Sequence, residues 1–274
     1  MKQAADFMPT RTPTGENCPD CGRALYTCTI PAVGCFSVPQ ACACVLAQEE
    51  TQRKQQLERG RALVRQRLRE ISGMRKRQQT HTFAGFDAKT SAERRAKKPA
   101  LDAAAAFAAQ YLAGQASGVL YLHGHVGCGK THLACAIANR AIDRIAVRDE
   151  AAEYAGKYGE ARFLTRKPVR FTTAAEMLAE IRRSFRNAAQ TDILAECKRA
   201  RLLILDDLGA EKPSDWTREC LFELFDHRNE EGLPTVITSN LSPDSLREQL
   251  GERITDRIRD RAAAVRVPGG SERG

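Results

Sequence analysis

Residues 124–131 read GHVGCGKT and match the phosphate-binding loop G-x-x-x-x-G-K-[ST]. An apolar run at 118–123 precedes them and a helical pattern begins at Thr131, so the motif lies between a strand and a helix, as its mechanism requires. Its glycines let the backbone curl so that successive N–H groups point at phosphate oxygens, and the helix adds the positive end of its dipole. The sequence therefore predicts a nucleoside triphosphate site.

The side chains of this loop have separate expected roles. Lys130 would reach the β- and γ-phosphates, and Thr131 would bind magnesium. The motif alone does not separate an ATPase from a kinase. The other predicted nucleotide-binding residues are Gly124, Gly127, Cys128, Gly129 and His132.

Two carboxylates follow a second apolar run at 202–205. The end of a buried parallel strand places Asp206 and Asp207 at the carboxyl edge of the sheet, beside the phosphate loop. This is a Walker B pattern, in which Asp206 would help hold magnesium and Asp207 would orient or deprotonate the attacking water. Many ATPases carry glutamate at the second position, so Asp207 leaves the speed of hydrolysis open.

Three more polar residues complete the candidate catalytic set. Asn240 follows the apolar segment 235–238 and occupies the sensor 1 position, from which an amide can hydrogen-bond the water or the γ-phosphate. Arg253 and Arg257 are one helical turn apart, so they share a helix face. An arginine supplied to a neighbouring subunit would stabilise charge on the γ-phosphate, although an ordinary basic helix is the alternative.

The N-terminal region contains two close cysteine pairs that are separated by a loop of zinc-site length. Four thiolates complete a tetrahedron around zinc and leave no position for water, so the metal would stabilise a small module. A redox C-x-x-C is the alternative, but no thioredoxin-like pattern surrounds it. Cys28 or Cys35 could replace one member of the second pair. The predicted zinc ligands are Cys18, Cys21, Cys42 and Cys44.

Composition is ordinary for a globular protein, with 42% hydrophobic and 28% charged residues among 274. The N-terminus lacks the apolar core of a signal peptide and the apolar runs are only strand-length, so we expect a cytoplasmic protein without membrane association. The net charge of +9 is concentrated in a basic stretch at 53–77. This stretch favours a polyanionic partner or is a solvated linker.

Strands alternating with helices predict an α/β fold whose parallel sheet is covered on both faces. The expected strands are 118–123, 169–172, 202–205, 235–238 and 265–267. We expect three regions: a cysteine-rich zinc-binding domain (1–50), a basic helical linker (51–79) and an ATPase domain (80–274). Gly60 and Gly73 argue against one unbroken linker helix. A polar insertion at 143–167 has no readable role.

Taken in order, these segments resemble the AAA+ helicase loaders of the DnaC/DnaI type and their relative IstB. The matching pieces are the cysteine pairs and residues 82–86, 124–131, 205–216, 235–242 and 251–257. The resemblance implies an AAA+ P-loop ATPase domain with a parallel five-stranded sheet flanked by helices. A small zinc-binding domain that docks on the replicative helicase and a basic helical linker would precede it.

The resemblance also implies a nucleotide-dependent homo-oligomer that grips single-stranded DNA and loads the helicase. On this basis Arg257 matches the arginine finger, with Arg253 as second choice. A helical insertion before Walker B carries Arg182, Arg183 and Arg186, which would bind DNA phosphates, although a solvated helix face fits as well. Only residues 265–274 follow the finger helix, so a sensor 2 arginine cannot be placed.

Three other functions fit parts of the sequence. An IstB-like ATPase helper of transposition shares the ATPase core but lacks a cysteine-rich head, so the cysteines favour the loader. A P-loop kinase would need a lid instead of the sensor residue Asn240 and the Gly-Glu-Arg helix at 251–253. A zinc adaptor that binds nucleotide without hydrolysing it is supported by Asp207 and stays open.

Overall fold

The computed structural model describes residues 10–30, 36–40, 42–86, 90–147, 167–184, 192–260 and 262–269. The chain divides into two compact units, Met1–Gly60 and Arg61–Gly274. Three features singled out from the sequence lie outside the described residues: Cys35, Arg186 and residues 148–166 of the polar insertion.

The first unit is built on a small antiparallel sheet with the strand order β1-β2-β3. Its strands are β1 (Thr10–Asn17), β2 (Ala24–Ile30) and β3 (Phe36–Gln40). Cys18 is the only buried residue among those of this unit whose burial is described. Among the residues whose burial is described, this unit therefore has almost no apolar core of its own.

Helix α1 (Ala43–Ser72) begins in the first unit and continues into the second. Gly60 does not interrupt it, although a glycine inside a helix costs about 1 kcal/mol relative to alanine. The helix ends at Gly73, where φ is +85° and an added Cβ would lie 2.6 Å from the carbonyl oxygen of Phe171. Of the two glycines expected to interrupt the linker helix, only Gly73 ends it, because only Gly73 adopts a conformation that other residues avoid.

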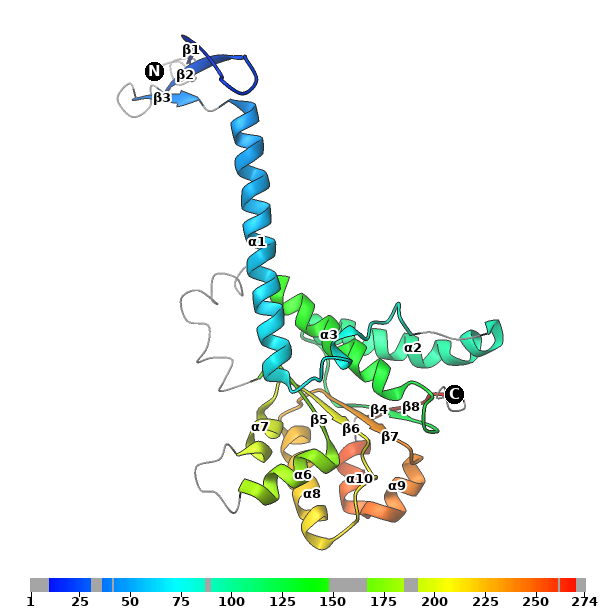
Figure 1. Cartoon of the computed structure of the whole chain (residues 1–274). Helices are drawn as coiled ribbons and strands as arrows, with labels where there is room; N and C mark the ends of the chain where they lie inside the picture. The colour runs from blue at the N-terminus through cyan, green and yellow to red at the C-terminus, as the bar shows by residue number, and fades with distance from the viewer. Residues whose placement is uncertain are drawn as a thin grey trace, which may run out of the picture. The chain divides into compact units, whose positions relative to one another are not determined.

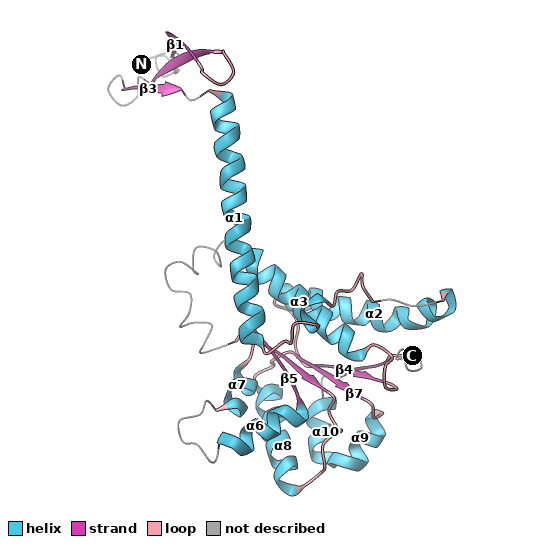
Figure 2. Cartoon of the chain, viewed as in Figure 1, coloured by secondary structure: helices cyan, strands magenta, loops and turns pink. Residues whose placement is uncertain are grey.

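The second unit contains a five-stranded, fully parallel sheet with the order β5-β6-β7-β4-β8 (Figures 1 and 2). Its strands are β4 (Val119–His123), β5 (Val169–Thr173), β6 (Leu202–Asp206), β7 (Thr235–Ser239) and β8 (Ala262–Arg266). The predicted α/β fold is confirmed. The last strand starts three residues before the expected 265, because three alanines pair with β4 despite their low strand propensity.

Helices cover both faces of this sheet (Figure 1). The end of α1, with α2 (Ser91–Leu112) and α3 (Lys130–Val147), packs on one face. The opposite face is covered by α6 (Ala174–Ser184), α7 (Ile193–Arg199), α8 (Asp215–Glu230), α9 (Pro243–Leu250) and α10 (Glu252–Arg259). A short 3-10 helix, η3 (Gln78–Thr80), lies between α1 and α2 in the chain.

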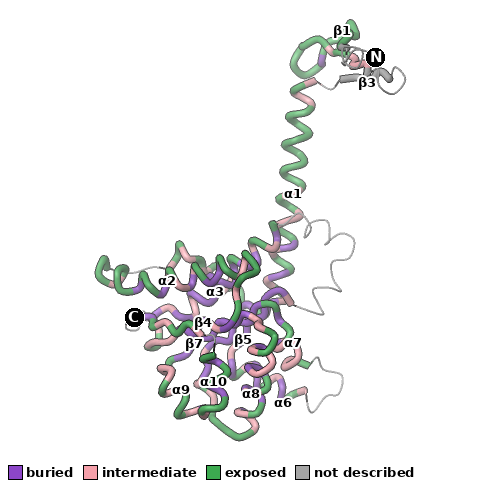
Figure 3. The backbone as a smooth tube through the Cα atoms, turned by 180° about the vertical axis from the view of Figure 1, so that it is seen from behind, coloured by how far each residue is buried: buried purple, intermediate pink, exposed green. Residues whose placement is uncertain are grey.

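Strand residues alternate between the two cores, as the period of two requires. Leu120 and Leu122 pack with α2 and α3, whereas Tyr121 packs with the helices of the other face. Strands β4, β5, β6 and β7 are largely buried, whereas the edge strand β8 is partly exposed (Figure 3). Ser214 and Ser242 cap α8 and α9 by accepting hydrogen bonds from the backbone N–H groups of Thr217 and Ser245.

The strand order determines where the chemistry can lie. His123 of β4 is in register with Ser239 of β7, and Leu205 of β6 is in register with Ile237. The loops that follow β4, β6 and β7 therefore begin side by side at the carboxyl edge of the sheet, where ligands bind in open α/β sheets.

Arg228 is a buried anchor of this arrangement, since it is 2% exposed. Its guanidinium donates to the carbonyls of Cys197 and Ala200 at the end of α7 and to the carbonyl of Pro234, and its Nε donates to Thr235 Oγ1 at the start of β7. These bonds lie between 2.7 and 2.8 Å. One side chain thus joins α8, α7 and β7.

We expect Arg228→Met to lower the free energy of unfolding by about 3 kcal/mol, because buried carbonyls would lose their donors. Arg218→Met is the matched control on the same helix, since Arg218 is paired at 3.2 Å with an exposed Asp215. That exposed pair should contribute less than about 1 kcal/mol. Chemical denaturation of both variants measures the difference, and equal losses would contradict the anchoring role.

Candidate functional site

The phosphate-binding loop connects β4 to α3, and its glycines are required by both conformation and space. Gly124 and Gly129 have φ values of +153° and +103°. An added Cβ at Gly129 would lie 2.5 Å from the ring of Phe86, and one at Gly124 would collide with the carbonyl oxygen of Val267. The segments around Phe86 and Val267 therefore pack directly on the loop.

Lys130 lies at the centre of the loop and is 5% exposed. Its Nζ donates to the carbonyl oxygens of Gly124 at 3.0 Å and His125 at 2.8 Å, and to Oδ1 of Asn240 at 2.9 Å. The fold thus brings together the predicted phosphate-binding lysine and the predicted sensor residue. A γ-phosphate held by this ammonium group would lie within reach of the Asn240 amide.

Asp206 is the second centre of the site. Oδ1 of Asp206 accepts hydrogen bonds from Thr131 Oγ1 at 2.9 Å and from Thr238 Oγ1 at 2.6 Å. Burial raises the pKa of Asp206 above its ordinary value and the Asp207 charge adds to this rise, whereas the two hydroxyl groups and Lys130 lower it. A hydroxyl beside a carboxylate is a set of hard oxygen ligands, which suits magnesium.

Asp207 is the one described residue other than glycine with a positive φ, at +55°. Its backbone N–H donates to Thr238 Oγ1 at 2.9 Å, and the N–H of Leu208 donates to the Thr238 carbonyl at 2.9 Å. Sequence reasoning did not select Thr238. The available signal was its polar side chain near the carboxyl end of a buried strand, two positions before Asn240.

The segment at 81–86 lies against the first turn of α3. Nε2 of His132 lies 2.8 Å from the carbonyl oxygen of Thr82, and the imidazole ring stacks on His81 with centroids 4.4 Å apart. Burial lowers the pKa of His81, and the charges of His132 and Arg77 lower it further. His132, expected at the nucleotide, therefore has its ring directed to this segment.

Arg253 and Arg257 of α10 both contact α8. The Arg253 guanidinium lies 3.8 Å from the centroid of the Phe222 ring, that of Arg257 lies 6.0 Å from it, and Nε of Arg257 is 2.7 Å from Oδ1 of Asp226. Within the described part of the chain, neither arginine bonds to residues 124–131. Their position is compatible with action on another copy of the chain, not on their own loop.

The predicted DNA-binding arginines begin on α6. The Arg182 guanidinium stacks 4.4 Å above the centroid of the Trp216 ring at the start of α8. The neighbouring Arg183 is exposed and donates through Nε to the carbonyl of Ala179 at 3.4 Å. Arg186 lies outside the described residues.

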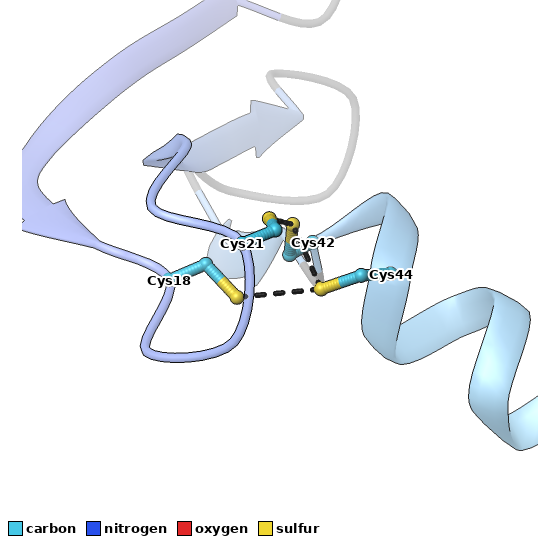
Figure 4. A group of neighbouring side chains, drawn as sticks. All are labelled: Cys18, Cys21, Cys42 and Cys44. Atoms are coloured by element: carbon cyan, nitrogen blue, oxygen red, sulfur yellow. Dashed lines mark hydrogen bonds between the residues drawn. The ribbon is translucent and has the colours of Figure 1, made fainter.

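The two cysteine pairs meet at the start of α1, as Figure 4 shows. Sγ of Cys18 is 3.4 Å from that of Cys44, and Sγ of Cys21 is 3.3 Å from that of Cys42. All four sulfur atoms lie within 4.8 Å of one another. Tetrahedral Zn–S bonds of about 2.3 Å separate their sulfurs by about 3.8 Å, so this group fits zinc after small shifts.

Two details bear on the choice of ligands. Cys18 and Cys21 are each closest to a cysteine of the other pair, which is unlike a redox C-x-x-C. Cys28 is outside the four-sulfur group, and Cys35 is outside the described residues. A hydrogen bond from the backbone of Cys44 lowers the pKa of Cys42 to about 7, so this thiol ionises readily.

The sequence is similar to those of several known proteins. The family model of the IstB-like ATP binding protein matches residues 160–274. The replicative helicase loader DnaI of Bacillus subtilis is 31% identical over 167 residues, which are 56% of this chain and 47% of DnaI. The loader DnaC of Escherichia coli is 26% identical over 201 residues, 73% of this chain and 71% of DnaC. The chain thus spans about half the length of DnaI.

A structural comparison agrees on the fold. The crystal structure of the DnaC helicase loader matches with a TM-score of 0.53 and 22% identity, covering 71% of this chain and all of that one. Among the described residues, no helix has both the length and the apolar character needed to cross a membrane. Residues 160–274 therefore match the family model of the IstB-like ATP binding protein, and the chain is homologous to the replicative helicase loaders DnaC and DnaI.

Proposed function

We propose that this chain is an ATP-dependent loader that binds the replicative helicase and places it on single-stranded DNA. The proposal rests on two hydrogen-bonded pairs at one site, Lys130 with Asn240 and Thr131 with Asp206. They occur in a chain whose similarity to DnaC spans 73% of its length. Hydrolysis at this set would drive a change in assembly.

The ATP chemistry follows from the residues at the carboxyl edge of the sheet. The loop N–H groups and Lys130 bind the β- and γ-phosphates, and Lys130 exchanges carbonyl partners for phosphate oxygens. Thr131 and Asp206 would hold magnesium, which would supply charge neutralisation at the phosphates. Asp207 orients the attacking water and Asn240 contacts the water or the γ-phosphate.

The arginines of α10 extend the site to a second subunit. Arg257 would reach the γ-phosphate of a neighbouring copy and stabilise transition-state charge, with Arg253 beside it. Hydrolysis would then require a nucleotide-dependent homo-oligomer. The ion pair with Asp226 and the ring of Phe222 would hold the guanidinium groups in place until a neighbour arrives.

DNA and helicase contacts would lie elsewhere on the chain. Arg182, Arg183 and Arg186 would bind DNA phosphates, and the stacked pair of Arg182 and Trp216 offers a flat surface of the kind that bases stack on. The zinc-binding domain (1–50) would dock on the helicase, the basic linker (51–79) would connect it, and the ATPase domain (80–274) would act from the cytoplasm on DNA.

An ATPase helper of DNA transposition is the second candidate, because the matching family model is that of IstB-like proteins. The four-cysteine group favours the loader, since it provides a separate module for a protein partner. The two functions differ in the partner that each would capture.

The first test measures ATP hydrolysis by the purified chain with and without single-stranded DNA, together with capture of the replicative helicase. We expect DNA to stimulate hydrolysis and the helicase to be retained. Lys130→Ala should abolish both nucleotide binding and hydrolysis because the phosphates lose their cation. Lys98→Ala is the control, since Lys98 is exposed and paired with Asp102. Stimulation without capture would favour the transposition helper, and the absence of both would exclude both candidates.

Arg257→Ala should leave ATP affinity within about twofold and lower DNA-stimulated hydrolysis about 100-fold or more, because the trans charge on the γ-phosphate is lost. Arg259→Ala, on the same helix and also exposed, should hydrolyse normally. The readouts are equilibrium binding of a fluorescent ATP analogue and steady-state turnover. Normal stimulated turnover of the Arg257 variant would remove the finger assignment.

Serine substitution of both Cys18 and Cys21 should release one zinc per chain and weaken helicase capture, while the ATPase unit stays folded. Metal analysis and a pull-down measure the two effects. Cys28→Ser, outside the four-sulfur group, should retain its zinc. Unchanged zinc in the double variant, or loss in the control, would overturn this ligand set.

A further inference from the structure

Thr238 is buried between the two acidic residues at the end of β6. Its side chain is polar but 0% exposed, and the neighbouring strand residues Val236 and Ile237 are apolar. Its hydroxyl donates to Asp206 Oδ1 at 2.6 Å and accepts the N–H of Asp207 at 2.9 Å. A hydroxyl has a single proton to donate, and here that proton is directed to the Asp206 carboxylate.

The same residue holds the backbone that follows. Its carbonyl oxygen accepts the N–H of Leu208 at 2.9 Å, so Thr238 binds two consecutive backbone N–H groups of the turn. Asp207 between them has a φ of +55°, a conformation that side-chain-bearing residues disfavour. Such a conformation persists where the surroundings over-determine it, and the Thr238 bonds supply part of that constraint.

We propose that Thr238 is a positioning residue that sets the orientation of both carboxylates for ATP hydrolysis. This inference rests on the proposed ATPase function. Both hydrogen bonds to the Asp206 carboxylate, from Thr131 and Thr238, fall on Oδ1. Within the described residues no hydrogen bond falls on Oδ2, so this oxygen would be available to a metal ion or its water ligands.

Thr238 also relates the acids to the sensor residue. Asn240 follows it by two positions and accepts from Lys130 at 2.9 Å. Strand β7 therefore carries the hydroxyl that orients the magnesium-side carboxylate and ends at Ser239, directly before the phosphate-side amide of Asn240. The short, rigid backbone between Thr238 and Asn240 would limit how far these two groups can move relative to each other.

The turn keeps other supports when the hydroxyl is removed. Ser239 Oγ donates to the Leu208 carbonyl at 2.6 Å, and the backbone bond from Leu208 to Thr238 does not involve the side chain. Thr238→Val keeps the shape and the β-branching of the residue. We therefore expect this variant to fold and to lose alignment of the carboxylates.

The test compares full-length Thr238→Val and Thr238→Ser with the unsubstituted chain. The first readout is the factor by which magnesium tightens binding of a fluorescent ATP analogue, relative to binding in EDTA. The second is the turnover number with its magnesium dependence. For Thr238→Val, affinity in EDTA should change less than about twofold, whereas magnesium tightening and turnover should each fall about 10- to 100-fold. Thr238→Ser should keep most of both.

Each outcome decides the proposal. Unchanged tightening and turnover in Thr238→Val, or equal loss in Thr238→Ser, would overturn the role of the hydroxyl. Thr238→Ala replaces the valine variant if thermal unfolding shows that the latter is not folded. An unsubstituted chain that binds Mg-ATP without hydrolysing it would refute the ATPase while the first readout still tests Thr238. No nucleotide binding at all would refute both.

Discussion

The carboxylate of Asp206 is the constraint on which the site depends. A carboxylate that is 4% exposed is costly unless hydrogen bonds or a cation compensate it. Here Thr131 from α3 and Thr238 from β7 both donate to it. This requires β6 and β7 to be adjacent and parallel, and α3 to begin directly above their ends. The register of the sheet and the position of the phosphate loop are thus linked through one oxygen atom.

Helix α3 begins at this site, and the chain that precedes the ATP-binding loop contacts the helix along its length. Asn139 Nδ2 donates to the carbonyl oxygens of Gln78 and His81, each at 2.9 Å, and His132 contacts Thr82 in the first turn of the helix. Near its end, Asp143 pairs with Arg65 and Arg69 of α1. The basic residues of the linker in this second unit therefore serve partly as structural partners of α3.

Much of the fold could be predicted from the sequence, because motifs with defined mechanisms directly follow the predicted strands. The meeting of Lys130 with Asn240 followed from two strand positions, and the cysteine group followed from spacing alone. Other features depend on tertiary contacts. Gly60 stays helical within α1, alanines form β8 because β4 offers a partner, and the His132 ring turns to residues 81–82. Thr238 was missed because a threonine in a strand needs no special explanation.

Helix α8 connects functions that the sequence separates. Its first turn holds Trp216 beneath Arg182, and its middle holds Phe222 and Asp226 against the arginines of α10. Near its end, Arg228 is bonded to Thr235 at the start of β7, the strand that carries Thr238 and ends directly before Asn240. A helix is stiff over this length. A displacement of the proposed DNA-contacting or finger arginines would therefore be transmitted to β7, the strand that orients the Walker B acids. Helix α8 is thus one physical element through which the proposed coupling of assembly and hydrolysis can act.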